Sequence, residues 1–137
     1  MYLIDTDVLA ALRRRERSPS ISRWVAEQRD TDLHLSVVSV GEIERGIGQQ
    51  QRVNPEFARA LASWLDGLIA VYAERILAVD LATTRRWGRL SATLGHEGVD
   101  LLIAATALER GLTVVTRNVR HFEPTGVDVI DPSNAAD

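Results

Sequence analysis

The sequence contains neither cysteine nor lysine. Without cysteine, the chain forms no disulfide and offers no thiolate ligand to a metal ion. Without lysine, every mechanism that needs a catalytic lysine is excluded, including the phosphate-binding loop of the Walker A type. All the strongly basic side chains are therefore arginines.

Long apolar runs are also missing. No run approaches the roughly 20 residues that span a bilayer, and no signal peptide precedes Asp5, so we expect no membrane association and a cytoplasmic location. The net charge of −3 gives no overall attraction to nucleic acid. With 137 residues, 45% hydrophobic and 26% charged, the chain fits a single globular domain over residues 1–137.

Short apolar or β-branched runs alternate with segments of helical spacing. The runs, each read as a strand, are residues 1–4, 33–38, 76–79, 112–116 and 127–130. Ser18-Pro19 and Asn54-Pro55 mark helix starts between them. This alternation predicts a three-layer α/β/α sandwich around a central, mainly parallel sheet.

Three acids lie where an apolar segment meets a helix start. Asp5 ends the first strand, Glu42 lies in the first turn of a helix from Ser39, and Asp100 opens the apolar helix 101–108. In a parallel sheet these places converge at the carboxyl edge, where ligands bind. Crowded carboxylates repel, and a divalent cation resolves the repulsion. Hard oxygen donors without cysteine favour Mg²⁺, or Mn²⁺, over Zn²⁺.

Each acid also has a purely structural explanation. Ser39 and Glu42 fit a capping box, and Asp100 fits the cap of its own helix. Thr6 or Asp7 fits the cap of the first helix.

Other polar features allow two interpretations. The arginine-rich run 13–17 fits a solvated face, with a phosphate-contacting patch as the alternative. The three tryptophans lie on helical stripes and are expected in the core rather than as base-stacking platforms. His34 and His121 are expected to be incidental.

Four segments together resemble the four motifs of PIN-domain ribonucleases, in the branch of VapC-like toxins. They are Leu3-Ile4-Asp5-Thr6-Asp7-Val8-Leu9, Ser39-Val40-Gly41-Glu42-Ile43, Asp100-Leu101-Leu102-Ile103-Ala104-Ala105-Thr106-Ala107 and Val115-Thr116-Arg117-Asn118-Val119-Arg120-His121-Phe122. The resemblance covers essentially the whole chain, in order. It implies a Mg²⁺-dependent endoribonuclease held inactive by a cognate antitoxin.

The resemblance also implies roles for individual residues. The metal-site acids of the family map onto Asp5, Glu42 and Asp100. Among the supporting positions, Thr6 follows the first acid, Thr116 matches a hydroxyl beside the metal, and Asn118 stands at a fourth acidic position. An amide there contributes no charge, which puts a full second metal site in doubt.

The implied chemistry is hydrolysis of RNA by metal-activated water. Mg²⁺ on Asp5 and Asp100 lowers the pKa of bound water, and Glu42 completes the metal shell or acts as a base. Arg117 and Arg120 are candidates to hold RNA phosphates. Alternatively, these two residues are ordinary surface arginines in a loop.

We also expect two protein partners: the antitoxin and a second copy of the chain in a homodimer. The apolar side chains available for an antitoxin helix share helical spacing. They are Ile43, Ile47, Leu61, Trp64 and Leu68.

Two rival functions remain open. Asp5-Thr6-Asp7-Val8 fits the nucleophile motif of haloacid-dehalogenase phosphatases, although the missing lysine and the short length count against it. Alternatively, the chain is a catalytically degenerate PIN scaffold that only binds a partner, as Asn118 suggests.

Overall fold

The computed structural model describes residues 1–133 and contains one five-stranded parallel sheet in the order β3-β2-β1-β4-β5. Its strands are β1 (Tyr2–Ile4), β2 (Leu33–Ser36), β3 (Ile76–Leu77), β4 (Thr113–Val115) and β5 (Val129–Ile130). All five strands were predicted, but each is shorter than its apolar run. The strand predicted over residues 33–38 extends too far at its C-terminal end, because Val37 and Val38 already belong to a helix.

Helices make up most of the rest of the chain. The α-helices are α1 (Thr6–Arg13), α2 (Pro19–Glu27), α3 (Val37–Val53), α4 (Pro55–Tyr72), α5 (Leu81–Leu94), α6 (Val99–Arg110) and α7 (Val119–Phe122). Short 3-10 turns are η1 (Arg15–Arg17), η2 (Asp30–Asp32), η3 (Ala73–Arg75) and η4 (Glu123–Thr125). None of the helices in the described part of the chain has both the length and the apolar character to cross a membrane.

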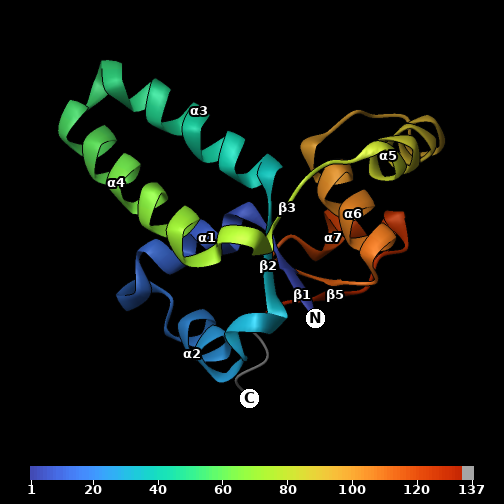
Figure 1. Ribbon diagram of the computed structural model, residues 1–137, viewed down its shortest axis with the longest axis horizontal. Helices are drawn as coiled ribbons and strands as arrows, with labels where there is room; N and C mark the ends of the chain where they lie inside the picture. The colour runs from blue at the N-terminus through green and yellow to red at the C-terminus, as the bar shows by residue number, and fades with distance from the viewer. Residues whose placement is uncertain (134–137) are drawn as a thin grey trace.

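The helices cover both faces of the sheet, which confirms the three-layer sandwich. On one face, Ile4 and Leu35 pack against apolar residues of α1, α2 and α4. On the other, Leu3 and Val114 pack against α6 and α7, and α5 lies along α6. Figure 1 shows these two groups of helices on opposite sides of the strands. Trp24 is buried in the first layer, as expected of a core tryptophan.

Helices α3 and α4 form a hairpin that extends away from the sheet (Figure 1). The hairpin has a small core of its own, in which Ile47, Ala58 and Leu65 are buried. Asn54 sits at the bend and caps α4 by accepting a hydrogen bond from the backbone N of Phe57 at 3.2 Å.

Candidate functional site

Asp5 lies at the carboxyl end of the central strand β1 and is 4% exposed. Its backbone N donates to Val115 O on the neighbouring strand at 2.9 Å. Its carboxylate accepts from the backbone N of Thr6 at Oδ1 and from Thr116 Oγ1 at Oδ2, both at 2.8 Å. Asp5 is therefore the N-cap of α1 as well as the strand end, and the prediction of Thr6 or Asp7 as the cap was wrong.

Asp7 is held close to Asp5 from within the first turn of α1. Asn118 Nδ2 lies 3.3 Å and Arg117 Nε 3.5 Å from Asp7 Oδ2, and Arg117 Nη2 donates to Asp7 O at 3.1 Å. Asp7 Oδ1 is buried and has no hydrogen-bond partner among the described residues. Asp7 was expected to act as a helix cap or, in the phosphatase alternative, as part of the nucleophile motif, whereas in the structure it is a second acid of this cluster.

The negative charge of Asp7 lies close enough to Asp5 to affect its pKa. Burial, with the negative charge of Asp7 as a smaller cause, raises the pKa of Asp5 to about 7, against the opposing hydrogen bonds from Thr116 and Thr6. Part of the negative charge at the end of β1 is thus not compensated by the protein.

Glu42 reaches this cluster through Thr6, whose Oγ1 lies 2.6 Å from Glu42 Oε1 and 2.8 Å from Ser39 Oγ. The predicted capping box of Ser39 and Glu42 is wrong, because α3 begins three residues earlier. Ser36 is its N-cap and accepts from the backbone N of Val38 at 3.0 Å. Glu42 therefore lies in the second turn of α3, with an exposed side chain that has no capping role.

Asp100 lies in the first turn of α6, but it does not cap the helix. Gly98 occupies the N-cap position, and no side chain caps this end. Asp100 Oδ2 instead lies 3.0 Å from His121 Nδ1 on α7. His121, expected to be incidental, is therefore a neighbour of a candidate site acid. His34 lies apart from these acids in the sheet, with Nδ1 3.2 Å from Tyr2 O.

The structure brings together some of the candidate metal ligands and not others. Asp5 is linked to Glu42 through Thr6, whereas Asp100 pairs with His121. Within residues 1–133, no three Asp, Glu or His side chains are placed closely enough to hold a metal ion. The donors still fit a hard divalent cation in kind, because they are oxygen atoms. The unpartnered Asp7 Oδ1 and the raised pKa of Asp5 are also what a missing positive charge produces.

The loop after β4 carries the remaining candidates. Thr116 is fully buried and bridges the site, since its Oγ1 accepts from Asn118 N at 2.9 Å while donating to Asp5. Arg117 and Arg120 are exposed. They line a hollow of about 510 Å³ together with Asn118, Val119, His121 and Asp131.

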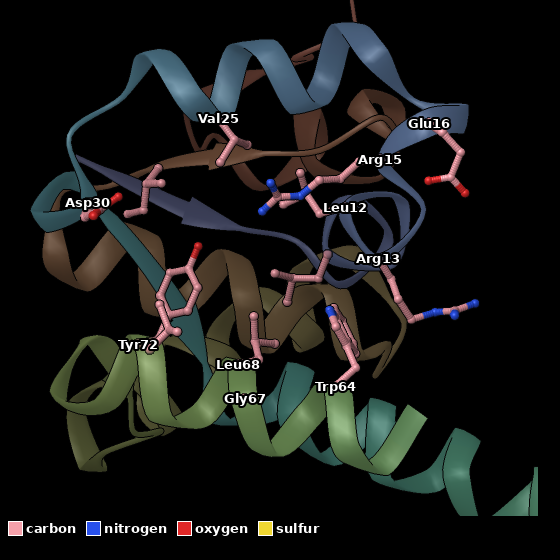
Figure 2. A pocket seen from close by; sticks show the side chains of 13 residues that line it. Leu12, Arg13, Arg15, Glu16, Val25, Asp30, Trp64, Gly67, Leu68 and Tyr72 are labelled. Atoms are coloured by element: carbon pink, nitrogen blue, oxygen red, sulfur yellow. The ribbon is translucent and has the colours of Figure 1, made fainter. Parts of the chain in front are cut away.

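A larger, mainly apolar groove lies on the other side of α1, between α1, α2 and α4 (Figure 2). Its volume is about 630 Å³. The apolar side chains that line it are Leu9, Leu12, Val25, Leu33, Trp64, Leu68, Val71 and Tyr72. Of the residues predicted to form a partner groove, Trp64 and Leu68 line it. Ile43, Ile47 and Leu61 do not, because they pack between α3 and α4.

Comparison with known proteins gives consistent matches over nearly the whole chain. The family model described as "PIN domain" matches residues 2–126. The plasmid stability protein StbB of Pseudomonas syringae pv. tomato is 34% identical over 98% of this chain and 100% of its own length. The VapC ribonuclease Y4jK of Sinorhizobium fredii is 30% identical, with 96% and 97% covered. The crystal structure of FitAcB from Neisseria gonorrhoeae superposes with a TM-score of 0.86 at 28% identity, covering 98% of this chain and 99% of that one.

Proposed function

The chain belongs to the PIN-domain family and resembles its VapC branch, and from this premise we propose that it is a metal-dependent endoribonuclease acting as the toxin of a toxin–antitoxin pair. The observation that carries the proposal is the pair of acids at the end of β1, of which Asp5 is buried and Asp7 is partly buried. Arg117 pairs with Asp7, but no described cation pairs with Asp5, and a third acid, Glu42, is linked to Asp5 through Thr6.

We propose that Asp5, Glu42 and Asp100 would hold Mg²⁺, with Mn²⁺ as a substitute, although the described residues do not place these three side chains together and a bound ion would have to draw Asp100 toward the other two. When bound, such an ion supplies an activated water and neutralises charge on the scissile phosphate. Thr116 fixes the rotamer of Asp5, and Thr6 holds Glu42 through Oε1. Oε2 of Glu42 would then either bind the ion or accept the proton of the attacking water.

Arg117 and Arg120 are assigned to the RNA phosphates beside the acids. Arg117 is oriented by Asp7, which contacts it at both the backbone O and the carboxylate. A guanidinium held in this way presents its remaining N–H groups in a fixed geometry, which suits phosphate binding.

Asn118 bears on the number of metal ions. Its Nδ2 donates to Asp7 and its backbone N donates to Thr116. The side-chain amide and the backbone N–H of Asn118 therefore both act as hydrogen-bond donors to residues of the site. We propose a positioning role for Asn118 and a single metal site.

The antitoxin is assigned to the groove in Figure 2, because its apolar lining suits the nonpolar face of a helix. This keeps Trp64 and Leu68 of the sequence-based prediction and replaces Ile43, Ile47 and Leu61 by residues of α1, α2 and α4. The homodimer stays a prediction, which light scattering of the purified chain tests.

The test of the proposed function is incubation of the purified protein with RNA in Mg²⁺ and in EDTA. A metal-dependent endoribonuclease produces internal cleavage in Mg²⁺ alone. A phosphatase of haloacid-dehalogenase type releases inorganic phosphate from phosphomonoesters, and a degenerate scaffold does neither. Absence of Mg²⁺-dependent internal cleavage on any of a set of structured and unstructured RNAs contradicts the proposal.

A further inference from the structure

The arginine-rich run 13–17 does not form one uniform patch. Arg13 lies over the ring of Phe57 on α4, with its Cζ 4.8 Å from the ring centroid. Arg15 lines the apolar groove. Arg17 turns to the opposite side and lines a separate hollow at the start of α2.

This second hollow has a volume of about 230 Å³ and shares a wall with the hollow beside the acids. Arg117 lines both. The others that line the smaller hollow are Arg17, Ser18, Pro19, Ser20, Ile21 and Ser133. Arg117 therefore lies between two adjoining hollows, with Arg120 in the lining of one and Arg17 in the lining of the other.

The charge along these two hollows is mostly uncompensated. Neither Arg17 nor Arg120 forms a salt bridge within residues 1–133, and both are exposed. Arg117 is paired with Asp7 at its inner end. Asp131 contributes one carboxylate to the larger hollow, where its Oδ1 accepts from Ser133 N at 2.9 Å. The smaller hollow has only arginine and neutral residues in its lining.

A negatively charged polymer that lies across the acids fits such a surface. The hydroxyls of Ser18 and Ser20 add neutral donors beside Arg17. The described lining of the smaller hollow has no aromatic side chain on which a base would stack, so recognition there is by phosphate rather than by base.

We propose that the hollow formed by Arg17 and Arg117 binds the phosphate backbone of the single-stranded substrate away from the scissile bond. The hollow thus extends the binding site beyond Arg117 and Arg120. The identity of the polymer as RNA depends on the proposed function, whereas the phosphate contact itself does not.

The test measures binding without cleavage, by fluorescence anisotropy of a labelled single-stranded RNA in EDTA at several salt concentrations. Three variants are compared with wild type: Arg17→Ala, Arg17→Lys and Arg52→Ala. Arg52 is the matched control because it is exposed at the end of α3, far along the hairpin, and forms no salt bridge within residues 1–133.

For Arg17→Ala we expect a loss of affinity of about five- to tenfold and a fall of about 0.7 in the slope of log K against log salt, the value for one lost phosphate contact on a single strand. Arg17→Lys keeps the positive charge, so we expect it to retain most of the wild-type affinity and most of the wild-type salt slope. A single-stranded DNA of the same sequence loses affinity equally, because the contact is to phosphate. In cleavage assays, Arg17→Ala raises KM and leaves kcat unchanged.

Two results overturn the inference. If Arg17→Ala and Arg52→Ala have the same affinity and salt slope, Arg17 contacts no phosphate. If the loss occurs with RNA and not with DNA, the hollow recognises the sugar rather than the phosphate. Failure of the proposed function is distinguishable, since wild type then fails to cleave RNA in Mg²⁺ while the binding difference in EDTA remains.

Discussion

Thr116 Oγ1 donates to Asp5 Oδ2 at 2.8 Å, across 111 residues of sequence. Both residues are buried at the ends of adjacent strands, β4 and β1. Thr116 also accepts from Asn118 N, so one hydroxyl fixes the carboxylate and the start of the loop that carries Arg117.

Replacing Thr116 tests this bridge. Thr116→Val keeps the shape but leaves a buried carboxylate oxygen and a backbone N–H unpaired, so we expect a loss of about 1–3 kcal/mol in the free energy of unfolding. Urea denaturation at pH 8 measures it. Thr116→Ser retains the hydroxyl and should lose clearly less. A larger loss in Thr116→Ser than in Thr116→Val would show that packing of the methyl group, and not the hydrogen bond, matters at this position.

The pH dependence of stability should reveal the buried acid. Because the pKa of Asp5 is raised from 3.8 to about 7 in the folded protein, the folded state binds more protons than the unfolded state between these values. In EDTA, this contribution to stability is fully present below pH 3.8 and is lost as the pH rises through about 7, with a slope of at most about 1.4 kcal/mol per pH unit.

The matched variant is Asp5→Asn, since Asn caps a helix as well as Asp does. We expect Asp5→Asn to be more stable than wild type in EDTA at pH 8, with the difference shrinking toward pH 4. Urea midpoints at several pH values give the comparison. A difference that does not change with pH would contradict the raised pKa.

Asp100 provides a separate test of metal binding. Because it is not a helix cap, Asp100→Asn should leave the melting temperature in EDTA within about 2 °C of wild type. When the Mg²⁺ concentration is about ten times its dissociation constant, binding raises the free energy of unfolding of wild type by about 1.4 kcal/mol. This corresponds to a rise in melting temperature of about 3 °C or more. We expect this rise to be absent in Asp100→Asn. Asp66→Asn, an exposed position on α4, is the control and should keep the rise.

The groove offers an equally well-matched pair of variants. Val71 lines the groove and is 68% exposed, while Val53 is 78% exposed at the end of α3. Val71→Glu places a charge in the proposed apolar contact with the antitoxin, and we expect the affinity for the antitoxin to fall at least about tenfold. Val53→Glu should bind normally. Calorimetric titration with the co-encoded partner measures both, and equal affinities would place the antitoxin elsewhere.

The sequence predicts the layers of this fold well because its strands are buried. An interior strand of a parallel sheet is apolar throughout, so runs such as 112–116 are visible without a partner. Asp5 was also identifiable, since it directly follows such a run. Helix starts were less certain. Ser36 and Ser39 are both suitable caps among apolar neighbours, and the choice between them depends on where β2 leaves the sheet.

Contacts between segments far apart in the chain could not be predicted from the sequence. His121 meets Asp100 only because the four-residue helix α7 packs against α6, and no local pattern encodes that contact. Asp7 was mistaken for a cap because its spacing suits one, while Arg117 and Asn118, its actual partners, lie about 110 residues away. Likewise, Arg17 and Arg117 share a hollow that only the folded chain creates.

We propose that Asp5, the acid at the end of β1, is part of the reacting centre of a nuclease. This assignment is tested most directly by the rate of cleavage of a labelled RNA by Asp5→Asn at saturating Mg²⁺, with circular dichroism confirming that the variant is folded. We predict a rate at least about a hundredfold below that of wild type. A rate within about tenfold of wild type would contradict the assignment of Asp5 to the reaction.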